Sequence, residues 1–133
     1  MCGYCPFART AAHDRDIRSR FVSGVLAELD LRLDQCRTLR RGRRPLATAY
    51  IGGGTPSVLE ADLFERLLTG TVGRLACAAD LELTVEANPE SLTPELAESW
   101  RGLGVQRLSL GVQSLQPEVL SRLDRNCSAD QAR

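Results

Sequence analysis

The sequence has no lysine, few aromatic residues and no long apolar run, and these absences exclude several classes of function. All 17 basic residues are arginine, so a Walker A phosphate loop, which needs a lysine, is excluded. The formal net charge of +0 gives no support for a nucleic-acid or acidic-membrane partner. No apolar run approaches the ~18 residues of a membrane span, and we expect no signal peptide.

The cysteines are more informative, because only two of the 5 have a motif spacing. Cys2 and Cys5 form a C-x-x-C pair. Such a pair is typical of a disulfide redox switch, of half a zinc site, or of two thiolates of an iron–sulfur cluster. The odd count and the lack of a second motif argue against a secreted disulfide framework, so we expect a cytoplasmic location.

The order of the predicted elements indicates a parallel α/β fold in one domain. Strands are predicted over 46–51, 81–87 and 105–112, and helices within 14–36, 55–72, 93–104 and 116–125. Alternation of this kind implies right-handed βαβ units. In the first helix, one apolar face is expected from residues four apart, namely Ile17, Phe21, Val25, Leu29 and Leu33.

Polar or glycine residues follow each predicted strand, at the end where parallel α/β proteins bind ligands. Glycines 52–54 follow the first strand; they suit either a tight turn or a backbone cradle for a small polar ligand, whereas Ser57 rules out a dinucleotide G-x-G-x-x-G motif. Glu86 ends the second strand and needs a ligand or a partner such as Arg125 or loop amides. Gln113 follows the third strand, as a ligand contact or a structural amide.

Taken together, "CGYCPF", "YIGGGTPS", "VEANPESLT" and "RLSLGVQS" resemble the radical S-adenosylmethionine (radical SAM) superfamily. Within it, they resemble the oxygen-independent coproporphyrinogen III oxidase-like family, which includes haem chaperones. The resemblance implies the N-terminal portion of a partial (β/α)6 TIM-type barrel with parallel strands. Residues 1–133 are then expected to be an incomplete radical SAM core, without the first strand, the first cluster cysteine and the C-terminal half of the barrel.

The resemblance also implies cofactors and the residues that bind them. Cys2 and Cys5 match two of the three thiolates that hold a [4Fe–4S] cluster. The positions that match SAM-contacting residues of the family are Tyr4, Gly53, Gly54, Thr55, Glu86, Gln113 and Arg125. No residue is assigned a catalytic role.

The branch of the family is indicated by Phe7, which stands where the oxidases carry a further cysteine. The resemblance therefore favours the haem chaperone-like branch, with porphyrin or haem and an electron donor as partners of the full-length protein. With two cluster cysteines, the chain alone is expected to be inactive or to hold a labile cluster.

Two alternatives from other classes use the same cysteines. One is a thioredoxin- or glutaredoxin-like thiol–disulfide protein, which gives the glycine run no role. The other is a zinc-binding interaction module that combines Cys2 and Cys5 with Cys36, Cys77 or His13.

Overall fold

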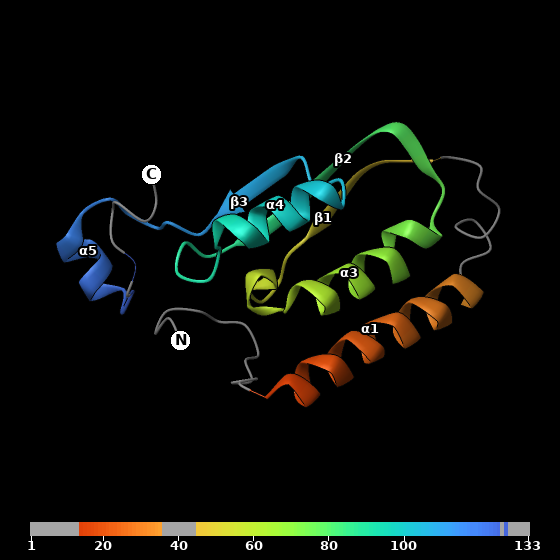
Figure 1. Ribbon diagram of the computed structural model, residues 1–133, viewed down its shortest axis with the longest axis horizontal. Helices are drawn as coiled ribbons and strands as arrows, with labels where there is room; N and C mark the ends of the chain where they lie inside the picture. The colour runs from red at the N-terminus through yellow and green to blue at the C-terminus, as the bar shows by residue number, and fades with distance from the viewer. Residues whose placement is uncertain (1–13, 36–44, 126, 128–133) are drawn as a thin grey trace.

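The computed structural model describes residues 14–35, 45–125 and 127. Helices and strands alternate along them (Figure 1). The elements are α1 (Arg15–Gln35), β1 (Leu46–Ile51), the short 3-10 helix η1 (Pro56–Val58), α3 (Ala61–Gly70), the 3-10 helix η2 (Val72–Arg74), β2 (Cys77–Ala87), α4 (Pro94–Gly102), β3 (Arg107–Leu110) and α5 (Pro117–Arg122).

The three strands form one parallel sheet in the order β1-β2-β3. The predicted parallel α/β architecture is therefore confirmed. Strand β1 has the predicted bounds, whereas β2 begins at Cys77 rather than at residue 81 and β3 is confined to Arg107–Leu110. At the carboxyl end of β3 the extended run stops at the turn around Gln113, whose φ is 67°.

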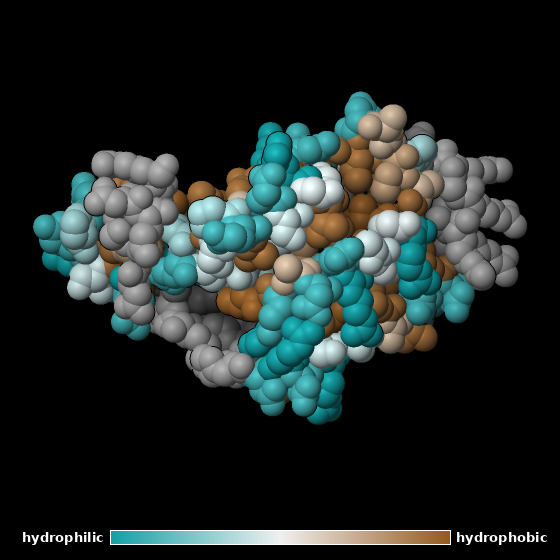
Figure 2. All heavy atoms as spheres, in the orientation of Figure 1, coloured by the Kyte–Doolittle hydropathy of each residue, from teal (hydrophilic) through white to brown (hydrophobic). Residues whose placement is uncertain are grey.

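The apolar core lies between one face of the sheet and the helices. Val22 of α1, Phe64 of α3, Val85 of β2 and Trp100 of α4 are fully buried, and the rings of Phe64 and Trp100 stack with centroids 4.5 Å apart. Figure 1 shows α1 and α3 side by side with α4 on the other side of α3, and Figure 2 shows hydrophobic surface between the hydrophilic outer sides of the helices. Four elements distant in sequence therefore share one core.

The apolar face predicted for α1 is wrong at its N-terminal end. Phe21 and Ile17 are 62% and 42% exposed, and Val22 is buried instead. An α-helix turns about 100° per residue, so a repeat of four drifts about 40° at each step and cannot stay on one face over the whole helix. The buried side therefore continues from Val25 and Leu26 to Val22.

Local signals set the helix that follows β2. Thr93 is the N-cap of α4, and its side chain accepts a hydrogen bond from the Leu96 amide at 3.2 Å, while Pro94 occupies the first turn. Both features were predicted. Among the described residues, no helix has the length and apolar character needed to cross a membrane.

Candidate functional site at the carboxyl ends of the strands

The register of the sheet brings the three segments that follow the predicted strands to one edge, and we call this edge the rim. Ile51, the last residue of β1, pairs with Val85, and Ala87, the last residue of β2, pairs with Leu110 at the end of β3. The glycine run, Glu86 and the segment that contains Gln113 therefore lie at neighbouring strand ends. This is the edge at which parallel α/β proteins bind their ligands.

Glu86 is half-buried, and both oxygens of its carboxylate are held. The Tyr50 hydroxyl donates to Oε1 at 2.6 Å, and the Gly53 amide donates to Oε2 at 3.1 Å. The sequence analysis considered Arg125 and loop amides as partners of Glu86. The structure provides a loop amide, that of Gly53. Tyr50 was missed, because a tyrosine within a strand is also an ordinary sheet-forming residue.

The glycine run combines one close approach with an open surface. A Cβ on Gly52 would lie 2.6 Å from Glu86 Oε2 and 2.8 Å from Tyr50 Cε1, so a side chain there would displace the carboxylate. Gly53 has a φ of +108°, which L residues rarely adopt. A Cβ on Gly54 would meet nothing within 4 Å. Gly53 and Gly54 are thus exposed beside the carboxylate, and the Gly53 amide is already used by Glu86.

Asn88, directly after β2, connects the rim segments. Its side-chain amide donates to Thr55 Oγ1 at 3.3 Å, and its backbone amide donates to Ser57 Oγ at 3.1 Å. Ser57 in turn lies 2.6 Å from Ser91 through their hydroxyl oxygens. Asn88 was not among the predicted site residues, although an asparagine after a strand and before a proline is a signal for a side chain that organises a turn.

Gln113 is exposed and lies in a strained turn. Its φ is 67°, and the Ser114 amide donates to the Val112 carbonyl across it at 2.8 Å. A hydrogen bond between residues two apart around a positive φ describes a γ-turn of the rare, strained kind. Such strain is concentrated at functional sites. The turn holds the Gln113 side chain close to Gly111, whose Cβ would lie 3.3 Å from Gln113 Nε2.

Arg125 is buried, with only 3% of its side chain exposed. Its Nη2 donates to the Gly111 carbonyl at 2.6 Å and to Asn88 Oδ1 at 3.4 Å, and its Nε lies 3.7 Å from Glu90 Oε1. The guanidinium therefore ties the chain after α5 to the segments after β2 and β3. Arg125 therefore lies at the predicted site, with little of its side chain exposed.

Three predicted residues, Cys2, Tyr4 and Cys5, lie outside the described residues. Of the further cysteines and the histidine considered for zinc, Cys36 and His13 also lie outside them, and Cys77 begins β2 at the opposite end of the sheet. Within 14–35, 45–125 and 127, no group of three His, Cys, Asp or Glu side chains is arranged to hold a metal ion.

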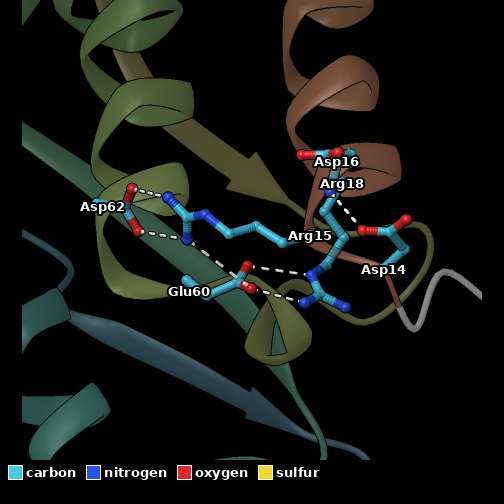
Figure 3. A network of polar contacts seen from close by, with 6 residues as sticks. All are labelled: Asp14, Arg15, Asp16, Arg18, Glu60 and Asp62. Carbon is cyan, nitrogen blue, oxygen red and sulfur yellow. Dashed lines mark hydrogen bonds and ion pairs between the residues drawn. The ribbon is translucent and has the colours of Figure 1, made fainter.

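An ion-pair network joins the start of α1 to the start of α3 (Figure 3). Arg15 pairs with both carboxylate oxygens of Asp62, and Arg18 donates to Glu60 at 2.6 and 3.0 Å. These hydrogen bonds hold the pKa values of Glu60 and Asp62 below their ordinary range. Residues 55–59 follow the glycine run, and Glu60 comes directly after them. The network therefore anchors this segment to α1.

Comparison with known proteins decides the family. A family model described as the radical SAM superfamily matches residues 1–133. The chain belongs to the radical SAM superfamily. The resemblance inferred from four short motifs is thereby confirmed at the level of the superfamily.

The chain is also similar to curated relatives named heme chaperone HemW. It is 37% identical to the protein of Escherichia coli K12 over 124 residues, which covers 93% of this chain and 32% of the relative. It is 38% identical to the HemW of Mycobacterium tuberculosis H37Rv over 126 residues, which covers 93% of this chain and 31% of the relative. The chain thus spans about a third of the length of these relatives.

A solved structure of the E. coli coproporphyrinogen III oxidase HemN, described as a radical SAM enzyme, has the same fold. The TM-score is 0.84 at 22% identity, over 99% of this chain and 29% of that chain. The archaeal Elp3 of Methanocaldococcus infernus matches with a TM-score of 0.53 at 22% identity, over 72% of this chain and 27% of that one. The predicted fold, the N-terminal portion of a radical SAM barrel with parallel strands, is therefore confirmed.

The superfamily generally uses a [4Fe–4S] cluster and SAM, and the rim suits the polar end of SAM. A carboxylate at Glu86 attracts a cation, and the exposed backbone at Gly53 and Gly54 offers carbonyl acceptors to an amino group. The absence of a Cβ at these glycines leaves room for close approach. The donor set of the described rim therefore fits a small zwitterionic ligand.

Proposed function

We propose that this chain forms part of the SAM-binding site of a haem-related radical SAM protein of the haem chaperone-like branch. The observation that carries the proposal is the meeting of Glu86, the open backbone of Gly53 and Gly54, and Gln113 at one edge of the sheet. The proposed contacts with SAM are made by Tyr4, Gly53, Gly54, Thr55, Glu86, Gln113 and Arg125.

Cys2 and Cys5 are the proposed ligands of a [4Fe–4S] cluster in this protein. Residues 1–133 would then be an incomplete radical SAM core. When bound, the cluster and SAM supply the one-electron chemistry, while the protein positions them and excludes water. We expect the chain alone to be catalytically inactive, because the family's cluster uses three thiolates and the motif supplies two.

Haem or porphyrin is proposed as a partner of the full-length protein in the cytoplasm, with an electron donor for the cluster. The support is that similar proteins are named heme chaperones. A haem titration followed by the Soret absorbance tests this. We expect saturable haem binding in the full-length protein and none in residues 1–133, and no saturable binding in either would refute the haem assignment.

The SAM proposal is tested by equilibrium binding to protein reconstituted anaerobically with iron and sulfide. Glu86→Ala should weaken SAM binding by about tenfold or more, because a charged acceptor is lost from the site. Glu82→Ala is the matched control: Glu82 is on the same strand and the same face, and its carboxylate accepts from Arg107 at 2.7 Å. Equal affinities of the two variants would refute a role for Glu86.

The cluster proposal is tested by iron and sulfide analysis of serine variants. Cys2→Ser and Cys5→Ser should each lower the iron bound per chain, whereas Cys77→Ser, at an exposed position of β2, should not. Zinc in place of iron would favour the interaction module. A dithiol that titrates without any metal would favour the thiol–disulfide protein, and catalytic turnover by this chain alone would refute its expected inactivity.

A further inference from the structure

Tyr50 stands out on the open face of the sheet because its polar end is fixed although its ring is not buried. The residue is 60% exposed, and its hydroxyl donates to Glu86 Oε1 at 2.6 Å. In the register, Tyr50 pairs with Thr84, so Glu86 is the next residue on the same face of β2 toward the carboxyl end. A tyrosine at this position therefore reaches diagonally to the strand end where the ligand site is proposed.

The hydroxyl is one of two donors that define where the carboxylate lies. The second is the Gly53 amide, which holds the other oxygen at 3.1 Å. A Cβ on Gly52 would lie 2.7 Å from Glu86 Cδ, so the carboxylate packs directly on the glycine backbone. A glutamate side chain has several rotatable bonds, and a group fixed at both oxygens has lost most of that freedom before a ligand arrives.

We propose that Tyr50 is a positioning residue for SAM binding, acting through Glu86. This inference rests on the proposed SAM-binding function. Each carboxylate oxygen accepts more than one hydrogen bond, so the bonds from Tyr50 and Gly53 orient the group and leave acceptor capacity for the ligand. Without the hydroxyl, the carboxylate samples other rotamers, and part of the binding free energy is spent on returning it to place.

The first test is a double-mutant cycle read out as the dissociation constant for SAM in the reconstituted protein. Tyr50→Phe should weaken binding about three- to tenfold, the loss expected for one orienting hydrogen bond. Thr48→Val is the matched control, because Thr48 lies on the same strand and borders the same open face. It should change the dissociation constant less than about twofold.

The cycle distinguishes action through Glu86 from a general structural effect. In a Glu86→Ala background, Tyr50→Phe should cause no further loss, because the group that it positions is absent. An equal loss in both backgrounds, or no loss in the parent protein, would overturn the inference. If the parent binds SAM and Glu86→Ala does not weaken it, the role of Glu86 and the positioning by Tyr50 both fail.

A second readout reports the hydrogen bond itself without any cofactor. The chain has only 2 tyrosines, so a protein labelled with ¹³Cζ-tyrosine gives two signals, and Tyr50→Phe identifies the one from Tyr50. Glu86→Ala should shift that signal, and Glu82→Ala should leave it in place. A signal unmoved by Glu86→Ala would overturn the inference even if SAM binds. A shifted signal in a protein that binds no SAM would keep the hydrogen bond and refute the proposed function.

Discussion

The two faces of strand β2 are built from alternating residues, and they do different work. Leu83, Val85 and Ala87 are buried against the helices, at 3%, 0% and 3% exposure. On the other face, Glu82 pairs with Arg107 and Glu86 with Tyr50, and the residues around this open face are mostly polar. One strand therefore supplies a hydrophobic core on one side and fixed polar groups on the other.

The difference shows how the fold keeps an exposed polar group in place. The covered face stabilises the fold through apolar burial, which depends on close packing of the buried side chains. The open face contributes little burial, so its side chains are ordered by hydrogen bonds to neighbouring strands and loops. Substitutions on the two faces should accordingly separate into losses of stability and losses of ligand binding.

The largest expected effect is on the covered face. Trp100→Ala should lower the free energy of unfolding by about 3–5 kcal/mol, because it leaves a cavity beside Phe64 in the fully buried core. Tyr50→Ala, which removes an aromatic side chain from the open face, should cost about 1 kcal/mol or less. Urea denaturation followed by circular dichroism measures both. Equal losses would contradict the division between the faces.

A second prediction concerns Arg125, at the edge of the sheet where the strands end. Arg125→Met should lower the free energy of unfolding by about 1–3 kcal/mol, because the Gly111 carbonyl loses a 2.6 Å hydrogen bond from a buried guanidinium. Arg122→Met, on an exposed position of α5, is the control and should be nearly neutral. A variant of Arg125 that unfolds like the parent protein but binds SAM weakly would support the proposed SAM contact and contradict a role of Arg125 in stability.

The same contrast explains which features were predictable from the sequence. The strand β2, the helix α4 and the position of Glu86 were predictable because their signals are local. These signals are the alternation of polar and apolar residues in β2 and the capping residues of α4. The partners of Glu86 were not predictable, because Tyr50 and Gly53 reach it through strand register, which a single sequence does not reveal. The prediction of the buried side of α1 was wrong at Phe21, because a four-residue repeat does not match the helical period.

A glycine of the rim and a glycine outside it make a sharper comparison. Gly52→Ala should weaken SAM binding by about tenfold, because its Cβ would lie 2.6 Å from Glu86 Oε2 and force the carboxylate away from its position. Gly102→Ala, at the end of α4 and outside the proposed site, adds the same methyl group where nothing lies within 4 Å. The dissociation constants of the two variants give the result. A Gly102→Ala loss as large as that of Gly52→Ala would indicate that displacement of the carboxylate is not the cause of the loss.

The smallest expected effect concerns the ion pairs between α1 and α3. The hydrogen bonds from Arg18 and Arg15 depress the pKa values of Glu60 and Asp62 in the folded protein. Their contribution to stability is therefore complete above the unfolded carboxyl pKa values of about 4, and it is lost as the pH falls through the depressed folded values.

Removing both Arg15 and Arg18 should therefore change how the free energy of unfolding depends on pH. The double variant Arg15→Gln, Arg18→Gln should lose less stability than the parent between about pH 5 and pH 3, measured as the shift of the urea midpoint. The double variant Arg20→Gln, Arg122→Gln removes two exposed arginines outside the network and controls for the loss of two surface charges. Parallel pH profiles of the parent and the double variant would mean that solvent screens the network, and that the segment after the glycine run is held by its packing alone.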